Sequence, residues 1–192
     1  WVGYHLKPEH LLRLSARPRR FRPDIHLSSP GASNADYLHS GFSRGHMAPA
    51  ADFAWSDDAI LSTFLLSNAV PQLQSANAGR WSQLESFVRR IAARSSSVHV
   101  FSGPLFESDP VQFIGPGQVA VPTHTFKVIL ALHHGRKTMY AAIIPNRAHL
   151  TEPLAFFATT VEQVQRRTGL DFFAALEDLE ERQLESTLNQ FK

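Results

Sequence analysis

The chain has 192 residues, 43% hydrophobic and 19% charged, so it is long enough to bury a core and too apolar for a disordered segment. It contains no cysteine, which excludes disulfides, cysteine-ligated metals and a thiol nucleophile. No apolar run approaches the roughly 20 residues of a membrane-spanning helix, and a formal charge of +2 only weakly indicates a polyanionic partner.

The N-terminal half is predicted to contain two strands and a helix around a long loop. Residues 1–6 alternate apolar with small or polar side chains and predict a strand. Residues 7–42 are rich in Pro, Ser, Arg and Gly and predict a loop with at most one short strand. A loop of that length usually carries function. Ser56, Asp57 and Asp58 predict the start of a helix, and the apolar run 63–68 predicts a buried strand.

The C-terminal half alternates predicted strands and helices. After the polar segment 74–78, a helix is predicted to about residue 93, because Trp81, Leu84, Val88 and Ile91 repeat at helical spacing. Strands are predicted at 98–102, 126–132 and 138–144, the last two joined as a hairpin. Helices are predicted at 161–168, ended by Gly169, and at 174–189. This arrangement favours an α+β fold.

The segment from Gly41 to Asp52 contains the most informative residues. Arg44, Gly45 and His46 set a cation, a flexible backbone and an imidazole side by side. Imidazole is the side chain best suited to move a proton near neutral pH. Taken alone, however, one histidine in a loop is more often a surface residue than a catalyst.

Three blocks of sequence resemble the DNA/RNA non-specific nuclease family. Residues 43–49, Ser-Arg-Gly-His-Met-Ala-Pro, are similar to its signature, and the block 66–72 is followed at the family's spacing by Asn77, Trp81 and Glu85. Residues 101–104, 121–128 and 144–146 continue the likeness, which reaches from residue 1 to about 146. The endonuclease-G-like branch and its EXOG relatives resemble the chain most. Most family members have Asp where this chain has Ser43, and the EXOG type has Ser there, so the resemblance does not imply an endonucleolytic or exonucleolytic preference.

The resemblance implies a ββα-metal nuclease fold, with a central antiparallel sheet flanked by helices. We expect a single nuclease domain over residues 1–192, with a C-terminal helix at about 174–190. The resemblance further implies that His46 is the general base and Asn77 the direct ligand of Mg²⁺, which Mn²⁺ can replace. Glu85 is implied to act through metal-bound water. Without the family, Asn77 reads as a helix N-cap and Glu85 as a solvated acid.

Two arginines complete the implied site. Arg44, next to the base, is expected to contact the phosphate through its planar fork. In the basic cluster of residues 17–24, Arg19 is chosen for the family's transition-state arginine, although Arg20 or Arg22 fits the loose register as well.

Other polar residues are assigned structural roles. His133 and His134 fall in the predicted hairpin turn, and His124 is expected to form structural hydrogen bonds. Asn68 is expected to satisfy backbone groups near the site. The acids of the last helix are expected to form a solvated face or to dock a partner: Glu177, Asp178, Glu180, Glu181 and Glu185.

The sequence therefore predicts a Mg²⁺-dependent nuclease that contacts the phosphate backbone of DNA and of RNA rather than base edges. Two alternatives stay open: a catalytically degenerate homologue that binds nucleic acid, and a toxin or effector held by an inhibitor protein. The resemblance also suggests a homodimer. Because the chain starts without Met and many relatives are exported, a secreted, periplasmic or organellar location is favoured over the cytoplasm, with no membrane anchoring.

Overall fold

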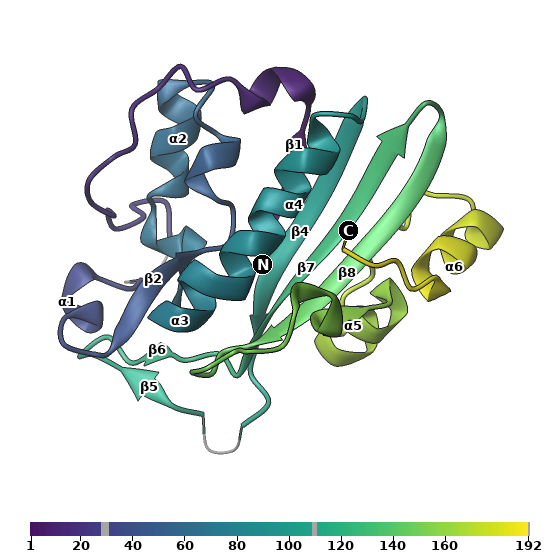
Figure 1. Ribbon diagram of the computed structural model, residues 1–192. Coiled ribbons are helices and arrows are strands. Elements are labelled where there is room, and N and C mark those ends of the chain that lie inside the picture. The colour runs from purple at the N-terminus through teal and green to yellow at the C-terminus, as the bar shows by residue number, and fades with distance from the viewer. Residues whose placement is uncertain (28–30, 109–110, 192) are drawn as a thin grey trace.

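Five strands form the central sheet of the protein, whose computed structural model describes residues 1–27, 31–108 and 111–191. The sheet is antiparallel throughout, and its strand order is β1-β4-β7-β8-β9. The predicted α+β fold with a central antiparallel sheet is confirmed (Figure 1). The strands are β1 (Val2–Leu6), β4 (Ser97–Leu105), β7 (His124–His133), β8 (Arg136–Pro145) and β9 (Ala158–Thr159).

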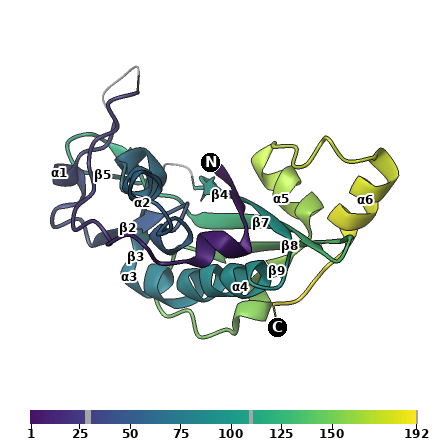
Figure 2. The same ribbon diagram turned by 90° about the horizontal axis from the view of Figure 1, so that it is seen from above.

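Helices cover both faces of this sheet. The helix α4 (Ser82–Ala92) lies on one face, and α5 (Val161–Thr168) and α6 (Asp178–Ser186) lie on the other (Figure 2). Side chains of β7 alternate between the two: Ile129 is buried in a cluster with Leu84 of α4, whereas Val128 and Leu130 are buried in a cluster with Val164 of α5. Burial on both faces explains the continuous apolar run of this strand.

The elements with strong local signals are confirmed. The β7–β8 hairpin turns at His134 and Gly135, whose φ angles of 48° and 77° match a tight two-residue turn. The Thr160 side chain caps α5, and Gly169 ends it with a φ of 69°. The Ser56 hydroxyl likewise accepts a hydrogen bond at the start of α2 (Asp57–Thr63).

The strand predicted at residues 63–68 is wrong. Helix α2 continues to Thr63, a short 3-10 turn follows at η3 (Leu66–Asn68), and the strand β3 starts later, at Ala69–Leu73. The Leu66 N–H donates to the Arg22 carbonyl at 2.9 Å, so this backbone is tied to the long loop rather than to a ladder. A short apolar run cannot by itself distinguish a strand from a buried turn.

The predicted C-terminal helix is shorter than expected. It begins at Asp178 rather than residue 174, because the Glu177 carboxylate accepts hydrogen bonds from the N–H groups of Leu179 and Glu180. It ends at Ser186, after which Thr187 has extended angles. The preceding segment is not helical and buries Phe172 in the sheet face that α5 covers.

The remaining elements are short. Residues 7–27 and 31–42 are mostly loop, as predicted, with an isolated bridge between Arg22 and Leu65. Among the described residues, no helix is long and apolar enough to cross a membrane. The other elements are η1 (Pro8–Leu11), α1 (Asn34–Tyr37), β2 (Phe42–His46), η2 (Ala50–Asp52), α3 (Gln74–Ala76), the π-turn η4 (Asn77–Trp81), β5 (Phe113–Ile114), β6 (Val119–Ala120) and η5 (Leu154–Phe157).

Candidate active site

Strands β2 and β3 form an antiparallel pair that leads into a helix. Arg44 lies opposite Pro71 and His46 opposite Ala69. Because alternate residues of a strand face the same way, Arg44 and His46 share one face of β2. β3 continues directly into α3, η4 and α4, so two strands and a helix form one unit (Figure 1).

Gly45 lets β2 cross a buried side chain. A Cβ at this position would lie 1.8 Å from the Oε1 atom of Gln72, on the face opposite His46. Gln72 is itself 1% exposed and donates to the Thr125 hydroxyl at 3.3 Å. The glycine of the motif is therefore required by close packing between β2 and the main sheet.

Asn68 holds the backbone that follows His46. Its side-chain carbonyl accepts from the Ala48 N–H, and its amide donates to the carbonyls of Ala48 and Thr63, all at 2.9 Å. The Met47 N–H donates to the Asn68 carbonyl at 3.0 Å. The prediction that Asn68 satisfies backbone groups is confirmed, and these bonds fix the position of the strand end that carries His46.

Aromatic rings enclose the imidazole of His46. The ring centroids of Phe21 and Phe64 lie 4.7 Å and 5.0 Å from that of His46, which is 9% exposed. Burial, and secondarily the charge of Arg17, lowers the pKa of His46 to about 4. Its Nε2 atom is buried and has no hydrogen-bond partner in the described part of the chain. At neutral pH the imidazole is uncharged and free to accept a proton.

Two arginines lie near His46. The Arg44 guanidinium donates to the Asn34 carbonyl at 3.0 Å and lies 4.9 Å above the Tyr37 ring. The Arg17 guanidinium lies 5.2 Å above Phe64, and its charge lowers the pKa values of His46 and Glu85. Sequence reasoning chose Arg19 and left open which arginine of residues 17–22 is catalytic; Arg17 and Arg19 are both exposed. The charge of Arg17, but not that of Arg19, is among the causes of these two pKa shifts.

Asn77 lies in the helical segment that follows β3. It has helical angles, and the helical segment begins earlier, at Gln74. The expectation that Asn77 opens the helix is therefore wrong, and Asn77 is not the N-cap either. Its half-buried amide has no hydrogen-bond partner among the residues that the structure describes. One turn later, the Trp81 indole donates to the His46 carbonyl at 3.0 Å, which brings the helix against β2.

The charge of Lys127, which is fully buried on β7, acts on the half-buried Glu85 of α4. Burial raises the pKa of Glu85, and the nearby Lys127 charge opposes this shift. Burial also lowers the pKa of Lys127, whose ammonium donates to the Ser102 hydroxyl at 2.5 Å and lies 4.6 Å above the Trp81 ring. Glu85 is half-buried, and burial is the main cause of its raised pKa, so it is not a fully solvated acid.

Asp52 extends this network. It accepts hydrogen bonds from the Tyr4 hydroxyl and the Arg89 guanidinium, both at 2.9 Å, and burial raises its pKa. Sequence reasoning assigned no role to Asp52 or Lys127. The available signal was a lysine inside the apolar run 126–132, because a charge in a buried strand needs a partner.

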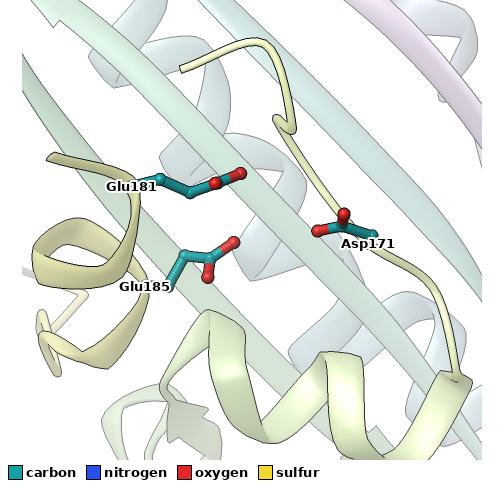
Figure 3. A group of neighbouring side chains, drawn as sticks. All are labelled: Asp171, Glu181 and Glu185. Atoms are coloured by element: carbon teal, nitrogen blue, oxygen red, sulfur yellow. The ribbon is translucent and has the colours of Figure 1, made fainter. Parts of the chain in front are cut away.

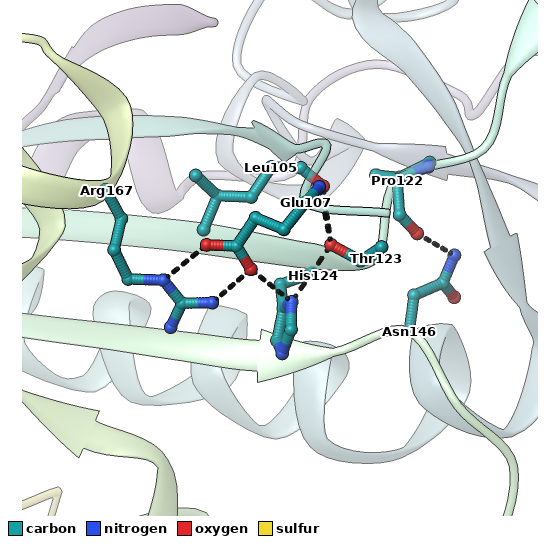
Figure 4. Close-up of polar contacts among 7 residues, drawn as sticks. All are labelled: Leu105, Glu107, Pro122, Thr123, His124, Asn146 and Arg167. Carbon is teal, nitrogen blue, oxygen red and sulfur yellow. Dashed lines mark hydrogen bonds and ion pairs between the residues drawn. The ribbon is translucent and has the colours of Figure 1, made fainter. Parts of the chain in front are cut away.

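Asn146 links β3 to the end of the main sheet. Its amide donates to the carbonyls of Pro71 and Pro122 at 2.9 Å and 3.0 Å, and its side-chain carbonyl accepts from the Leu73 N–H at 2.8 Å. Figure 4 shows the bond to Pro122. Leu73 is the last residue before α3, so these bonds set where the segment that carries Asn77 begins.

Two histidines outside the motif, His124 and His133, have structural contacts. His124 contacts the Glu107 carboxylate at 3.0 Å and the Thr123 hydroxyl at 3.1 Å, and Glu107 also pairs with Arg167 (Figure 4). The expected structural role of His124 is confirmed. His133, at the end of β7, contacts the backbone carbonyl of Arg94.

The acidic residues of α6 do not form a uniformly solvated face. Glu185 is 8% exposed and faces Glu181 and Asp171, with carboxylate oxygens within 4.8 Å of one another (Figure 3). Burial and the neighbouring carboxylates raise the pKa of Glu185. The expectation of a solvated face is wrong for this residue, because α6 packs beside α5 and turns it inward.

Known proteins are similar to this chain in sequence and in fold. The family model described as DNA/RNA non-specific endonuclease matches residues 1–179. Mitochondrial nuclease EXOG of Danio rerio is 41% identical over 92% of this chain and 56% of its own length. Human mitochondrial endonuclease G is 40% identical over 90% and 62%, and nuclease C1 of Cunninghamella echinulata var. echinulata is 40% identical over 92% and 76%.

A solved structure has the same architecture. It is described as the EndoG/EndoGI complex and the mechanism of EndoG inhibition, and it matches with a TM-score of 0.84 and 32% identity over 91% of this chain and 78% of that one. The ββα unit thus sits in a nuclease fold. The chain belongs to the DNA/RNA non-specific endonuclease family. It spans little more than half the length of the EXOG relative.

Proposed function

We propose that this chain is a Mg²⁺-dependent nuclease that hydrolyses phosphodiester bonds of DNA and RNA without reading the base sequence. The observation that supports this most is the state of His46: buried, uncharged, with an unpartnered Nε2 atom. It shares a face with Arg44, and its carbonyl is bonded to Trp81, one turn after Asn77.

His46 acts as the general base in this proposal. Hydrolysis requires removal of a proton from the attacking water, and the uncharged imidazole of His46, whose Nε2 atom has no other partner among the described residues, is the proposed acceptor. Because the phenyl rings keep the imidazole neutral, it is ready to take that proton at neutral pH. Asn68 and Trp81 hold its backbone, so the ring need not reorganise.

Asn77 and Glu85 fit a magnesium site. The Asn77 side chain has no other partner in the described residues, and amide and carboxylate oxygens are the donors that Mg²⁺ prefers. We assign Asn77 as the direct ligand and Glu85 as a ligand through water, with Mn²⁺ as a substitute ion. When bound, the ion supplies positive charge at the phosphate and the leaving oxygen.

The phosphate contacts are assigned to arginines. Arg44 is suited to bind a phosphate oxygen because its Nε atom is buried and unpartnered in the described part of the chain. For the arginine that stabilises the transition state, we propose Arg17 in place of Arg19, since its charge acts on both His46 and Glu85. Arg17→Ala should lower kcat more than Arg19→Ala, and the reverse order would return the role to Arg19.

The test is cleavage of plasmid, linear DNA and RNA with Mg²⁺ and with EDTA. We expect cleavage of all three only with Mg²⁺. His46→Ala should lower the rate by about 10²–10⁴-fold, while binding to DNA survives. Folded protein that cleaves nothing in Mg²⁺ would favour the degenerate homologue instead.

Partners and location follow from relatives and are proposals. The matched structure is described as a complex of EndoG with EndoGI, and by analogy an inhibitor protein binds this chain. A toxin or effector nuclease would be held by an inhibitor in the same way.

Several relatives are named as mitochondrial, which supports an organellar location. We also propose a homodimer. Light scattering measures the mass in solution, and a monomer at micromolar concentration would contradict it.

A further inference from the structure

A hollow of about 690 Å³ opens beside the C-terminal end of α4. Its walls are α4, the β7–β8 hairpin and the chain at residues 188–190. At about 1.5 Å per residue, α4 separates this hollow from Trp81 by roughly 15 Å. Its volume lies in the range of small-ligand sites. We call it the Arg94 pocket, and its polar and aromatic lining includes Arg90, Arg94, Ser95, His133, Arg136 and Tyr140.

The lining of the Arg94 pocket is positively charged. Three guanidinium groups line it, and none of the described residues that line it is acidic. Arg94 and Arg136 are exposed and form no ion pair within the described part of the chain. Cations gathered in a hollow repel one another and raise the local concentration of anions. The charge therefore favours an anionic ligand.

A buried hydroxyl adds a second, independent observation. Ser95 is 3% exposed and lines the pocket, yet its Oγ atom has no hydrogen-bond partner among the described residues. A buried hydroxyl without a partner is destabilising, so such a group in a folded protein usually binds a ligand or water. An anion with several acceptor oxygens can take a hydrogen bond from Ser95 and from the arginine forks together.

Part of the pocket wall is apolar or aromatic. Tyr140, Ile91 and Leu188 line it, and Tyr140 stacks with Phe191 at a centroid distance of 6.3 Å. Such a wall suits the organic part of a ligand rather than a bare inorganic ion.

We propose that the Arg94 pocket binds a phosphate group carried by a nucleotide, through the guanidinium groups of Arg94 and Arg136 and the Ser95 hydroxyl. The nucleotide is either free or part of a polynucleotide strand, because both present the same phosphate chemistry. Binding at this site does not depend on cleavage at His46, so the two proposals can be tested independently.

The test measures binding to the full chain in EDTA, in low-salt buffer without phosphate or sulfate. Calorimetry with adenosine 5′-monophosphate tests the free nucleotide, and fluorescence anisotropy with a labelled single-stranded oligonucleotide tests the strand. The variants are Arg94→Glu, Arg136→Glu and Ser95→Ala. Arg182→Glu, an equal charge change at an exposed position of α6, is the matched control.

For at least one probe, we expect Arg94→Glu and Arg136→Glu each to weaken binding by about tenfold. Ser95→Ala should weaken it about threefold without lowering the melting temperature. The His133 imidazole contacts the backbone carbonyl of Arg94 and not its guanidinium, so Arg94→Glu should fold normally. Binding of both probes that is unchanged in Arg94→Glu, or weakened equally in Arg182→Glu, would overturn the proposal.

Discussion

The uncharged state of His46 depends on two neighbouring rings. Phe21 and Phe64 exclude water from the imidazole, and desolvation disfavours its charged form. The pKa is therefore about 4, rather than the ordinary 6.5. A base with the lower value is a weaker proton acceptor, but it is fully available at every physiological pH.

This shift predicts the acid side of the pH profile of activity. A base that must be unprotonated loses activity as the pH falls through its pKa, so kcat/KM should hold until the pH approaches about 4. Phe21→Ala admits water, which raises the pKa towards 6.5 and should move the acid limb to higher pH. Profiles of the two proteins that superimpose would contradict the role of the ring.

At the scale of elements, the β2–β3 pair depends on the absence of a side chain at Gly45. Gly45→Ala places a methyl group against Gln72 and should destabilise the protein by about 1–3 kcal/mol. It should also lower activity, because β2 must shift and His46 with it. Urea unfolding measures the first effect and cleavage the second. Adding Gln72→Ala should restore much of both, and no rescue would mean that another contact sets the strand position.

The segment after β2 depends on Asn68. Asn68→Ala leaves the Ala48 N–H and two buried carbonyls without partners and should cost about 3 kcal/mol. Asn34→Ala is the control, since that exposed amide makes one bond to the Phe21 carbonyl and should cost less than about 1 kcal/mol. Equal losses in thermal or urea unfolding would show that the three buried bonds do not stabilise the fold.

At the scale of the whole molecule, the packing of α6 against α5 buries a carboxylate. Because the pKa of Glu185 is raised in the folded protein, the native state binds the proton more tightly than the unfolded chain does. Stability contributed by this group is therefore present at low pH and lost as the pH rises above about 4.5.

Removal of that charge should stabilise the protein. Glu185→Gln is expected to raise the melting temperature by about 2 °C at pH 8 and to have little effect at pH 4. Calorimetry at both values measures this difference. Glu9→Gln, which alters an exposed carboxylate, should change neither. A destabilised Glu185→Gln protein at pH 8 would mean that the carboxylate has a partner that stabilises it.

The accuracy of prediction from sequence differed between elements for a physical reason. The β7–β8 hairpin and α5 were predicted because turn residues and caps act over a few positions. Residues 63–68 were assigned wrongly because their backbone bonds the distant Arg22 carbonyl. The C-terminal helix was predicted too long, since an apolar pattern does not reveal the cap that Glu177 provides.

The sequence alone determined the family, the α+β layout and the candidate residues His46, Asn77 and Glu85, because motif spacing is a property of the chain. The tertiary structure decided their electrostatic states and partners. It enclosed His46 in rings, and it brought the charge of Lys127 near Glu85 and the charge of Arg17 near both His46 and Glu85. Desolvation and charge–charge interaction depend on distances between residues far apart in the chain, which no local pattern encodes.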